Sequence, residues 1–404
     1  MEVQRPPTPS PSPSADVRAT ITPFSPPPRE LRRSLRIWLP EQLDPNRDPL
    51  AARLFQHRLQ AFYEQFPNLP IEVRIKANAG IGGMFEALTA ASAAAPLALP
   101  DLVLLPRSFV APLARQGVLH PLDEYTQLAE EPGWYPYAQQ LATVESTLFG
   151  IPFLGDVLLL AYPQKLAGEL PLEWEDWLRS RYTLGFAAAD PKAVVLLALY
   201  LQAGGTIYDV QGRLMLDEDI LTKVLEQLSY AHRQGKLPFW VVQAEDDQLV
   251  SQNLLEGKID SGFVWGSTYL KNHLEEWHAV AGFLANKTTV TLAEGWLWAS
   301  TSPVPDQIGI SFQLARFLSE AEFISAYAQA IGYLPVVPEA FATWQESERA
   351  KELDTLSRLA QIVPPSSLMD PLGAVLRNAL SVVIRDRVPA PQAAKDAVTA
   401  LTEP

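Results

Sequence analysis

The sequence predicts an α/β protein built from parallel β-α-β units, and two observations carry this prediction. Short runs in which apolar and polar residues alternate, as they do in half-buried strands, recur along the first part of the chain. The longer segments between these runs repeat their apolar residues with the period of an amphipathic helix. Strands separated by helices pair in parallel, and the ligands of such sheets lie beyond the carboxyl ends of the strands.

Strands and helices alternate strictly in the first part of the chain. Leu35, Ile37 and Leu39 mark the first strand, and either Asp48 or Asn46 can cap the helix that follows. Glycines in the stretch AGIGG open the second helix, and Gly117 closes the third. The expected strands are 35–39, 71–75 and 100–106, and the expected helices are 48–66, 84–96 and 110–117.

The order changes in the rest of the chain. Two separate strands are expected at 148–153 and 157–163, because glycine and proline stand where the first run ends. A pair of short strands is expected at 206–216 around the turn sequence DVQG, and longer strands at 261–267 and 289–300. The remaining expected elements are helices that begin at 171, 194, 217, 246, 305, 320, 370 and 390.

Composition limits the classes of function. The chain has 404 residues, 48% of them hydrophobic and 19% charged, which suffices for two to three domains with large cores. Its net charge is −14 and it has no run rich in lysine and arginine, so binding to nucleic acid or to an anionic membrane is not expected. The absence of cysteine excludes disulfides, thiol nucleophiles and cysteine-ligated metals. The five histidines show no metal-binding spacing, and no uninterrupted apolar run has the roughly 18 residues of a membrane span.

The amino-terminal segment 1–34 is rich in proline and serine and cannot form a packed core. We interpret it as an extended, mobile tether, either a spacer between an anchor and the folded body or a tail without a role of its own. No apolar signal-peptide segment precedes it, so an export signal is not visible in this chain.

Motifs for catalysis are missing from the sequence. It contains no G-x-S-x-G, no H-E-x-x-H and no Walker lysine after AGIGG. The stretches EWED and EDDQ offer paired carboxylates of the kind a glycosidase uses, but acidic residues at helix amino termini are the simpler interpretation. We therefore expect neither an enzyme nor a bound cofactor or metal.

Six segments, in this order, carry a family resemblance. They are PDLVLLPRSFVAPLARQGVLHPLDEY, LFGIPFLGDVLLLAYPQKLAGELPLEWEDW, AGGTIYDVQGRLML, LLEGKIDSGFVWGSTYL, IGYLPV and LRNALSVVIRDRVPAPQAAKDAV. Together they resemble the family-1 extracellular solute-binding proteins of ABC importers, the sugar-binding group that includes the maltodextrin-binding proteins. The chain departs from the family pattern at Pro163, where asparagine is usual, and at Glu173, where threonine is common.

The resemblance implies a two-lobe fold like that of periplasmic binding proteins, of the class II type, with a ligand cleft between the lobes. Lobe one would comprise 35–155 plus 281–319, and lobe two 156–280 plus 320–404. The chain would cross between lobes near Gly155–Asp156 and near 279–282. The helices from about Glu320 onward would pack mainly on lobe two.

The resemblance also implies a function. The protein would be an extracytoplasmic, monomeric component of an ABC import system, at the cell surface, membrane-associated or in the periplasm. It would bind a sugar or oligosaccharide between hinged lobes and deliver it to permease subunits. Two alternatives stay open: a carbohydrate-active α/β enzyme, and a degenerate binding protein that acts as a sensor.

A sugar site needs aromatic platforms and a rim of carboxylates, amides and backbone donors. Trp265 ends a strand, and Gly266 leaves space in front of it, although a tryptophan packed into the core beneath a turn would have the same pattern. Trp296 and Trp298 lie on one strand, so one of the two is expected at the ligand and the other in the core. The polar candidates follow strand ends. The full set of expected ligand-binding residues is Trp38, Glu41, Gln42, Asn78, Gly80, Asp156, Trp240, Gln243, Trp265, Gly266, Ser267, Glu294, Trp296 and Trp298.

Overall fold

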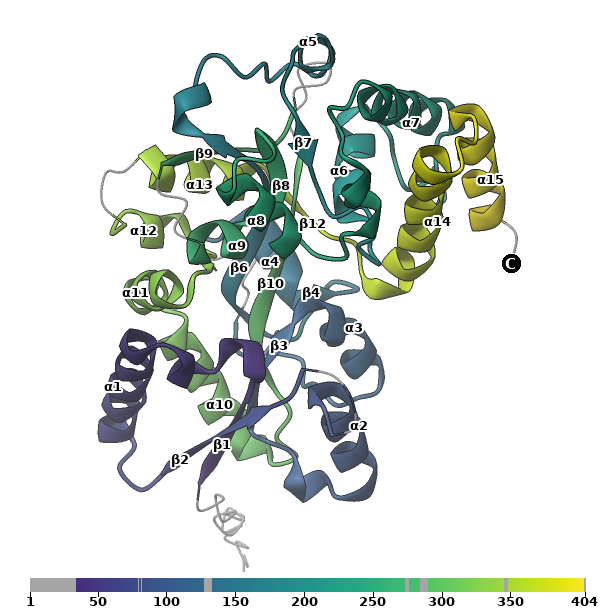
Figure 1. Cartoon of the computed structure of the whole chain (residues 1–404). Helices are drawn as coiled ribbons and strands as arrows, with labels where there is room; N and C mark the ends of the chain where they lie inside the picture. Colours follow the sequence, from purple (N-terminus) through teal and green to yellow (C-terminus); the bar gives the residue numbers. More distant parts are fainter. Residues whose placement is uncertain are drawn as a thin grey trace, which may run out of the picture. The chain divides into compact units, whose positions relative to one another are not determined.

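A computed structural model describes residues 34–78, 80, 82–126, 133–272, 276–283, 290–344 and 348–402 (Figure 1). The predicted tether lies outside the described residues, apart from Ser34. The described part contains a ten-stranded sheet with the strand order β2-β1-β3-β10-β6-β8-β7, in which β9 and β11 pair with β6 and β12 pairs with β10. The strands are β1 Leu35–Pro40, β2 Ile71–Lys76, β3 Leu102–Pro106, β6 Ile151–Pro163, β7 Leu184–Gly185, β8 Ser261–Trp265, β9 Trp277–Val280, β10 Thr291–Ser300, β11 Leu334–Pro335 and β12 Ala360–Ile362.

Helices connect these strands. Asp48, one of the two expected caps, caps the first helix and accepts hydrogen bonds from the N–H groups of Leu50 and Ala51. The helices are α1 Pro49–Gln65, α2 Met84–Ala94, α3 Arg107–Arg115, α4 Pro136–Ala142, α5 Trp174–Arg179, α6 Val194–Gln202, α7 Glu218–Arg233, α8 Gln248–Leu255, α9 Gly266–Lys271, α10 Pro305–Leu318, α11 Ala321–Ile331, α12 Pro338–Phe341, α13 Glu348–Leu359, α14 Ser366–Arg385 and α15 Ala390–Thr402.

The predicted β-α-β units are confirmed at the start of the chain. Strand β1 pairs in parallel with both β2 and β3, and α1 and α2 lie on opposite sides of β1 and β2 (Figure 1). The carboxyl ends of β1 and β3 therefore point to the same edge of the sheet. Strand β10 runs antiparallel to β3 and β6 and places its own residues beside that edge.

The prediction of two separate strands at 148–153 and 157–163 is wrong. One continuous strand, β6, runs from Ile151 to Pro163. Its first part pairs with β10, and its second part pairs with β8 and β9. Gly155 does not end the strand, because its missing side chain makes room for Tyr137 of α4, whose hydroxyl lies 2.0 Å from the place a Cβ would take.

Two short strands were also expected around DVQG, and a single antiparallel bridge between Tyr208 and Leu214 stands there. A small pair of strands that the sequence did not reveal, β4 Thr143–Val144 and β5 Thr147–Leu148, precedes β6.

The buried residues form two hydrophobic cores. The first core joins β1, β3 and the first part of β6 to α1, α4, α10 and α11, and contains Trp298. The second core joins the second part of β6 to α6, α7, α14 and α15, and contains Trp177. Strands β6 and β10 contribute residues to both cores, so the backbone is continuous across the place where the cores meet.

The expectation that the helices from about Glu320 onward pack mainly on lobe two is correct only for α14 and α15, because the last helices divide between the two cores. Helix α11 packs against α1, where the rings of Phe55 and Tyr327 lie 5.8 Å apart. Helices α14 and α15 pack against α6 and α7. Helix α14, Ser366–Arg385, is by length and composition apolar enough to cross a membrane, and it buries its apolar side chains in the second core as core helices of similar composition do.

Candidate functional site

A cavity of about 180 Å³ lies where the two cores meet. Trp296 belongs to the first core and Trp265 packs against the second, and both rings line this cavity. The carboxyl ends of β1 and β3 also reach it, as expected for a sheet of this type. The lining residues are Gln42, Pro106, Arg107, Ser108, Asp156, Trp265, Glu294, Gly295, Trp296 and Tyr333.

Asp156 anchors the start of α9 from the middle of β6. Its carboxylate accepts hydrogen bonds from the backbone N–H of Ser267 at 2.9 Å and from the Ser267 hydroxyl at 2.5 Å. Burial raises the pKa of Asp156 to about 7, and the Ser267 hydrogen bonds oppose that shift. A Cβ on Gly266 would lie 3.0 Å from Leu334 and 3.3 Å from Asp156. The expectation that this glycine leaves open space is therefore wrong, because other residues of the protein fill that space.

A second carboxylate holds Trp265 in place. The backbone N–H of Trp265 donates to Asp247 at 2.7 Å, and burial raises the pKa of Asp247. Lys271, at the end of α9, lies with its ammonium 4.2 Å from the ring centre of Tyr333. Burial lowers the pKa of Lys271, while Asp156 and Asp247 oppose that shift. The backbone of Trp265 and the wall of the cavity are thus both held by a network of partly buried charged groups.

Glu294 lies directly opposite Asp156 on the neighbouring strand. The two residues are partners in the antiparallel register of β10 and β6, so their side chains leave the same face of the sheet. Glu294 forms an ion pair with Lys192, which lies in the loop before α6. Asp190 of that loop accepts hydrogen bonds from the N–H groups of Lys192 and Val194, which fixes the loop. Each of the two facing carboxylates therefore has its own protein partner.

Arg107, the first residue of α3, is the one positively charged side chain among the described residues that line the cavity. Its Nη2 donates to the carbonyl of Thr143 at 3.0 Å, and burial lowers its pKa. Among the described residues, its Nε and Nη1 have no hydrogen-bond partner although both atoms are buried. Leaving a buried donor unpaired costs about 1–3 kcal/mol, and more for a charged group. Buried polar groups are nearly always hydrogen-bonded in proteins, so these two unpaired donors call for an explanation.

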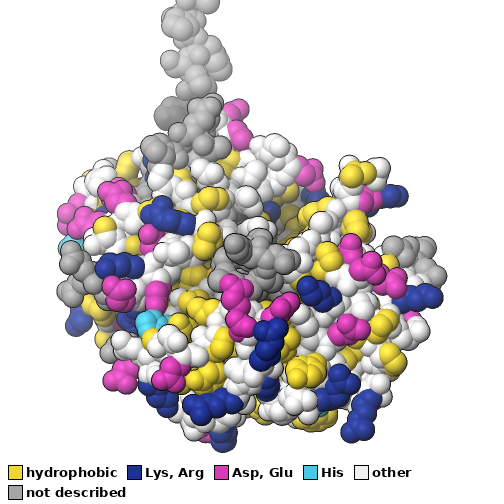
Figure 2. Space-filling model, turned by 90° about the horizontal axis from the view of Figure 1, so that it is seen from above, with side chains coloured by type: hydrophobic (Ala, Val, Ile, Leu, Met, Phe, Trp, Pro, Cys, Tyr) yellow, Lys and Arg dark blue, Asp and Glu magenta, His cyan; other side chains and the backbone are white. Residues whose placement is uncertain are grey.

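Of the fourteen residues expected at the ligand, the structure brings seven together. Gln42, Asp156, Trp265, Glu294 and Trp296 line the cavity, and Gly266 and Ser267 contact Asp156 directly behind its wall. Acidic and basic side chains are interspersed on the face of the molecule seen in Figure 2.

The other seven expected residues lie elsewhere. Trp298 is fully buried in the first core, 5.1 Å from the ring of Phe153. The register of β10 against β6 shifts between Trp296 and Leu297, and of the two tryptophans of β10 only Trp296 lines the cavity. Trp240 covers Gly185 of β7 from the 3-10 helix Phe239–Gln243, and Gln243 ends that helix exposed to solvent.

Four of these residues lie in β1 or just after β1 and β2, and none of them lines the cavity. Glu41 is exposed and pairs with Arg47 at 2.8 Å, and Asn78 is half-buried with its side-chain oxygen unpaired among the described residues. Gly80 takes a φ of +84° in a turn. Trp38 is buried in β1 with the Lys76 ammonium 4.1 Å from its ring centre.

Sequence reasoning did not single out five lining residues. Pro106, Arg107 and Ser108 form the carboxyl end of β3, which the alternation of elements had marked as a ligand-facing place, but none of their side chains was chosen. Gly295 follows Glu294 directly. Tyr333 lies in the IGYLPV segment, one of the six that carry the family resemblance.

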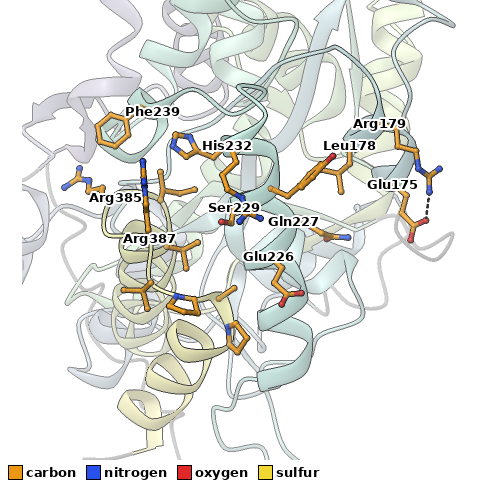
Figure 3. A pocket seen from close by; sticks show the side chains of 18 residues that line it. Glu175, Leu178, Arg179, Glu226, Gln227, Ser229, His232, Phe239, Arg385 and Arg387 are labelled. Carbon is orange, nitrogen blue, oxygen red and sulfur yellow. Dashed lines mark ion pairs between the residues drawn. The ribbon is translucent and has the colours of Figure 1, made fainter.

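A larger hollow of about 1360 Å³ lies on the outer side of the second core, among α5, α7 and the junction of α14 and α15 (Figure 3). Its residues come from second-core elements alone. Arg385, Arg387, His232 and Phe239 gather on one side of it, and the Arg179–Glu175 ion pair lies on the other. None of the fourteen expected residues lines it.

Solved structures share this fold. The chain matches a cyclo/maltodextrin-binding protein complexed with maltotetraose at a TM-score of 0.75, with 16% identity over 93% of this chain and 98% of that one. It matches the sugar-binding protein MalE of Xanthomonas citri at 0.73, with 17% identity over 91% and 96%. It also matches a cyclic alpha-maltosyl-1,6-maltose binding protein of Arthrobacter globiformis at 0.73, with 14% identity over 91% and 97%. A search of curated proteins finds no match.

Two cores joined by shared strands, with a cavity lined from both, define the two-lobe α/β fold of the periplasmic binding proteins. A family model of the bacterial extracellular solute-binding proteins matches residues 57–353. The chain belongs to this family, and the resemblance found in the sequence is confirmed.

Proposed function

We propose that the protein is the extracytoplasmic substrate-binding component of an ABC import system and that it binds a sugar or oligosaccharide in the cavity between its lobes. The observation that carries the proposal is that two tryptophans, Trp265 and Trp296, line one cavity together with Gln42, Asp156 and Glu294. Aromatic faces pack against the C–H faces of a sugar, and carboxylates and amides bind its hydroxyl groups. One similar structure contains maltotetraose and another is named a cyclic alpha-maltosyl-1,6-maltose binding protein, which supports the same class of solute.

The lobes would be 35–155 plus 281–319 and 156–280 plus 320–404, hinged where β6 and β10 pass between the cores. Helix α11, which falls in the second of these ranges, packs against α1 and so adds to lobe one. A solute that contacts both lobes favours the closed form, because it binds that form better than the open one. The cavity is smaller than the roughly 300–1,000 Å³ of sites for drug-sized ligands, which favours a short solute. The closed monomer would then deliver the solute to membrane permease subunits.

An enzymatic role is the second candidate, because Asp156 and Glu294 face each other across neighbouring strands. A glycosidase uses such a pair with one carboxyl free as acid and the other as base or nucleophile. Here Ser267 occupies both oxygens of Asp156, and Lys192 pairs with Glu294, so both side chains are engaged in holding the site together. This arrangement supports binding over turnover.

A thermal-shift screen of the full chain against mono- and oligosaccharides tests the proposal. A ligand that binds only the folded state raises Tm with its concentration. We expect a saturable rise that the folded Trp265→Ala variant loses, with the sugar recovered unchanged by chromatography. Consumption of the sugar would favour the enzyme, and the absence of any shift across the panel would contradict a sugar receptor.

A further inference from the structure

We propose that the solute carries an anionic group, and that Arg107 binds this group in the cavity. The inference rests on the proposed sugar-binding function and names the chemical class of the solute. It starts from an imbalance among the charged side chains of the cavity: the carboxylates have protein partners, and the guanidinium does not.

The carboxylates are already satisfied. Asp156 accepts two hydrogen bonds from Ser267, and Glu294 is paired with Lys192. Burial also favours the neutral form of Asp156 near neutral pH. Neither residue therefore presents a full, uncompensated negative charge to a solute in the cavity.

The guanidinium of Arg107 is only partly satisfied. It donates from Nη2 to the Thr143 carbonyl, while its Nε and Nη1 are buried without a partner among the described residues. No ion pair of Arg107 with a described carboxylate exists in the structure, and Arg107 lines the cavity. A planar guanidinium with unpaired donors matches the geometry of a carboxylate or phosphate group, which can accept two parallel hydrogen bonds.

The surroundings of Arg107 favour negative charge as well. Arg107 is the first residue of α3, whose N-cap is Pro106, so no side chain of the N-cap satisfies the first N–H groups of the helix. Pro106 and Ser108 line the same cavity, so this helix end borders the cavity. The positive end of the helix dipole adds to the charge of Arg107. A neutral sugar hydroxyl accepts hydrogen bonds from such donors, but only an anionic group also gains from their positive charge.

The test is isothermal titration calorimetry of the full chain with matched pairs of sugars: glucose and glucuronate, galactose and galacturonate, with glucose 6-phosphate as a further arm. We expect at least one acidic member to bind tenfold or more tightly than its neutral partner. The uronate and phosphate arms distinguish a carboxylate from a phosphate. In Arg107→Gln the preference for the acidic sugar should fall to threefold or less. In Arg107→Lys an intermediate preference should remain, because lysine keeps the positive charge but lacks the two parallel N–H donors of a guanidinium.

Arg179→Gln is the matched control, because Arg179 is exposed, lies in the outer hollow and pairs with Glu175. It should leave the preference unchanged. If neutral sugars bind as tightly as acidic ones in the unaltered protein, the inference is overturned while the sugar receptor stands. If no sugar binds at all, both fail. If Arg107→Gln does not fold, the preference of the unaltered protein for the acidic sugar and the reduction of that preference in Arg107→Lys still test the inference.

Discussion

Asp156 and Ser267 are 111 positions apart in the sequence and are joined by two hydrogen bonds, one to each carboxylate oxygen. This contact ties the middle of β6, the strand shared by both cores, to the first turn of α9 directly after Trp265. A substitution at Asp156 is therefore expected to affect the position of Trp265 in the cavity as well as the sheet.

Stability is expected to depend on pH through Asp156. Its folded-state pKa of about 7 lies above the value of about 3.9 for an unfolded aspartate. Between these values the folded state holds a proton that the unfolded state has lost, so the stabilisation is complete below about pH 4 and is lost as the pH rises to about 7.

Asp156→Asn keeps one acceptor and adds one donor toward Ser267, and it removes the titration. We expect urea unfolding at pH 5, 6, 7 and 8 to give a smaller fall in the free energy of unfolding with pH than in the unaltered protein. Part of the slope should remain, because the pKa of Asp247 is also raised. Among the other ionisable groups around Asp156, burial raises the pKa of Tyr137 and of Tyr333 and lowers the pKa of Lys271. An unchanged slope would show that Asp156 is ionised in the folded protein at pH 6.

The two tryptophans of β10 should differ in what their loss changes. Trp296→Ala removes a ring that lines the cavity, so affinity for a bound sugar should fall tenfold or more, about 1.4 kcal/mol. Trp298→Ala leaves a hole in the first core and should lower the free energy of unfolding by about 3–5 kcal/mol. Affinity is measured by calorimetry and stability by denaturant unfolding. Equal losses of affinity in both folded variants would contradict the assignment.

Glycines at the centre of the sheet are expected to be essential for stability. Gly155 and Gly295 are cross-strand partners on β6 and β10, and α4 packs over them with Tyr137 and Leu141. A Cβ on Gly155 would lie 2.0 Å from the buried Tyr137 hydroxyl, so Gly155→Ala should lower the free energy of unfolding by about 1–3 kcal/mol.

Gly309→Ala, in helix α10, serves as the control, because its Cβ would make an ordinary contact of 3.5 Å with Tyr125. Alanine is the better helix former by up to about 1 kcal/mol, so this variant should be as stable as the unaltered protein or more stable. If Gly155→Ala left the free energy of unfolding unchanged, α4 would be able to move away from the sheet without a loss of stability.

The sequence predicted the elements whose signals are local. The alternation around Leu35–Leu39, the Asp48 cap and the position of Trp265 at a strand end were all readable from neighbouring residues. The continuity of β6 was not, because Gly155 indicates a break in isolation and is explained only by Tyr137 packing against it.

The partners within the site were equally hidden. Lys192 meets Glu294 across 102 positions, and Arg107 donates to the Thr143 carbonyl across 36. A local sequence pattern cannot predict such pairs, because the topology of the sheet brings their residues together. Aromatic residues at strand ends could be chosen from the sequence, whereas the unpaired guanidinium required the structure.

The most direct measurement is a crystal structure of the full chain with the sugar that gives the largest thermal shift. We expect the sugar ring between Trp265 and Trp296, with hydroxyl groups within hydrogen-bond distance of Asp156, Glu294 or Gln42. A solute found instead in the outer hollow lined by Arg385, Arg387 and Phe239, with the cavity between the cores empty, would contradict the proposed site.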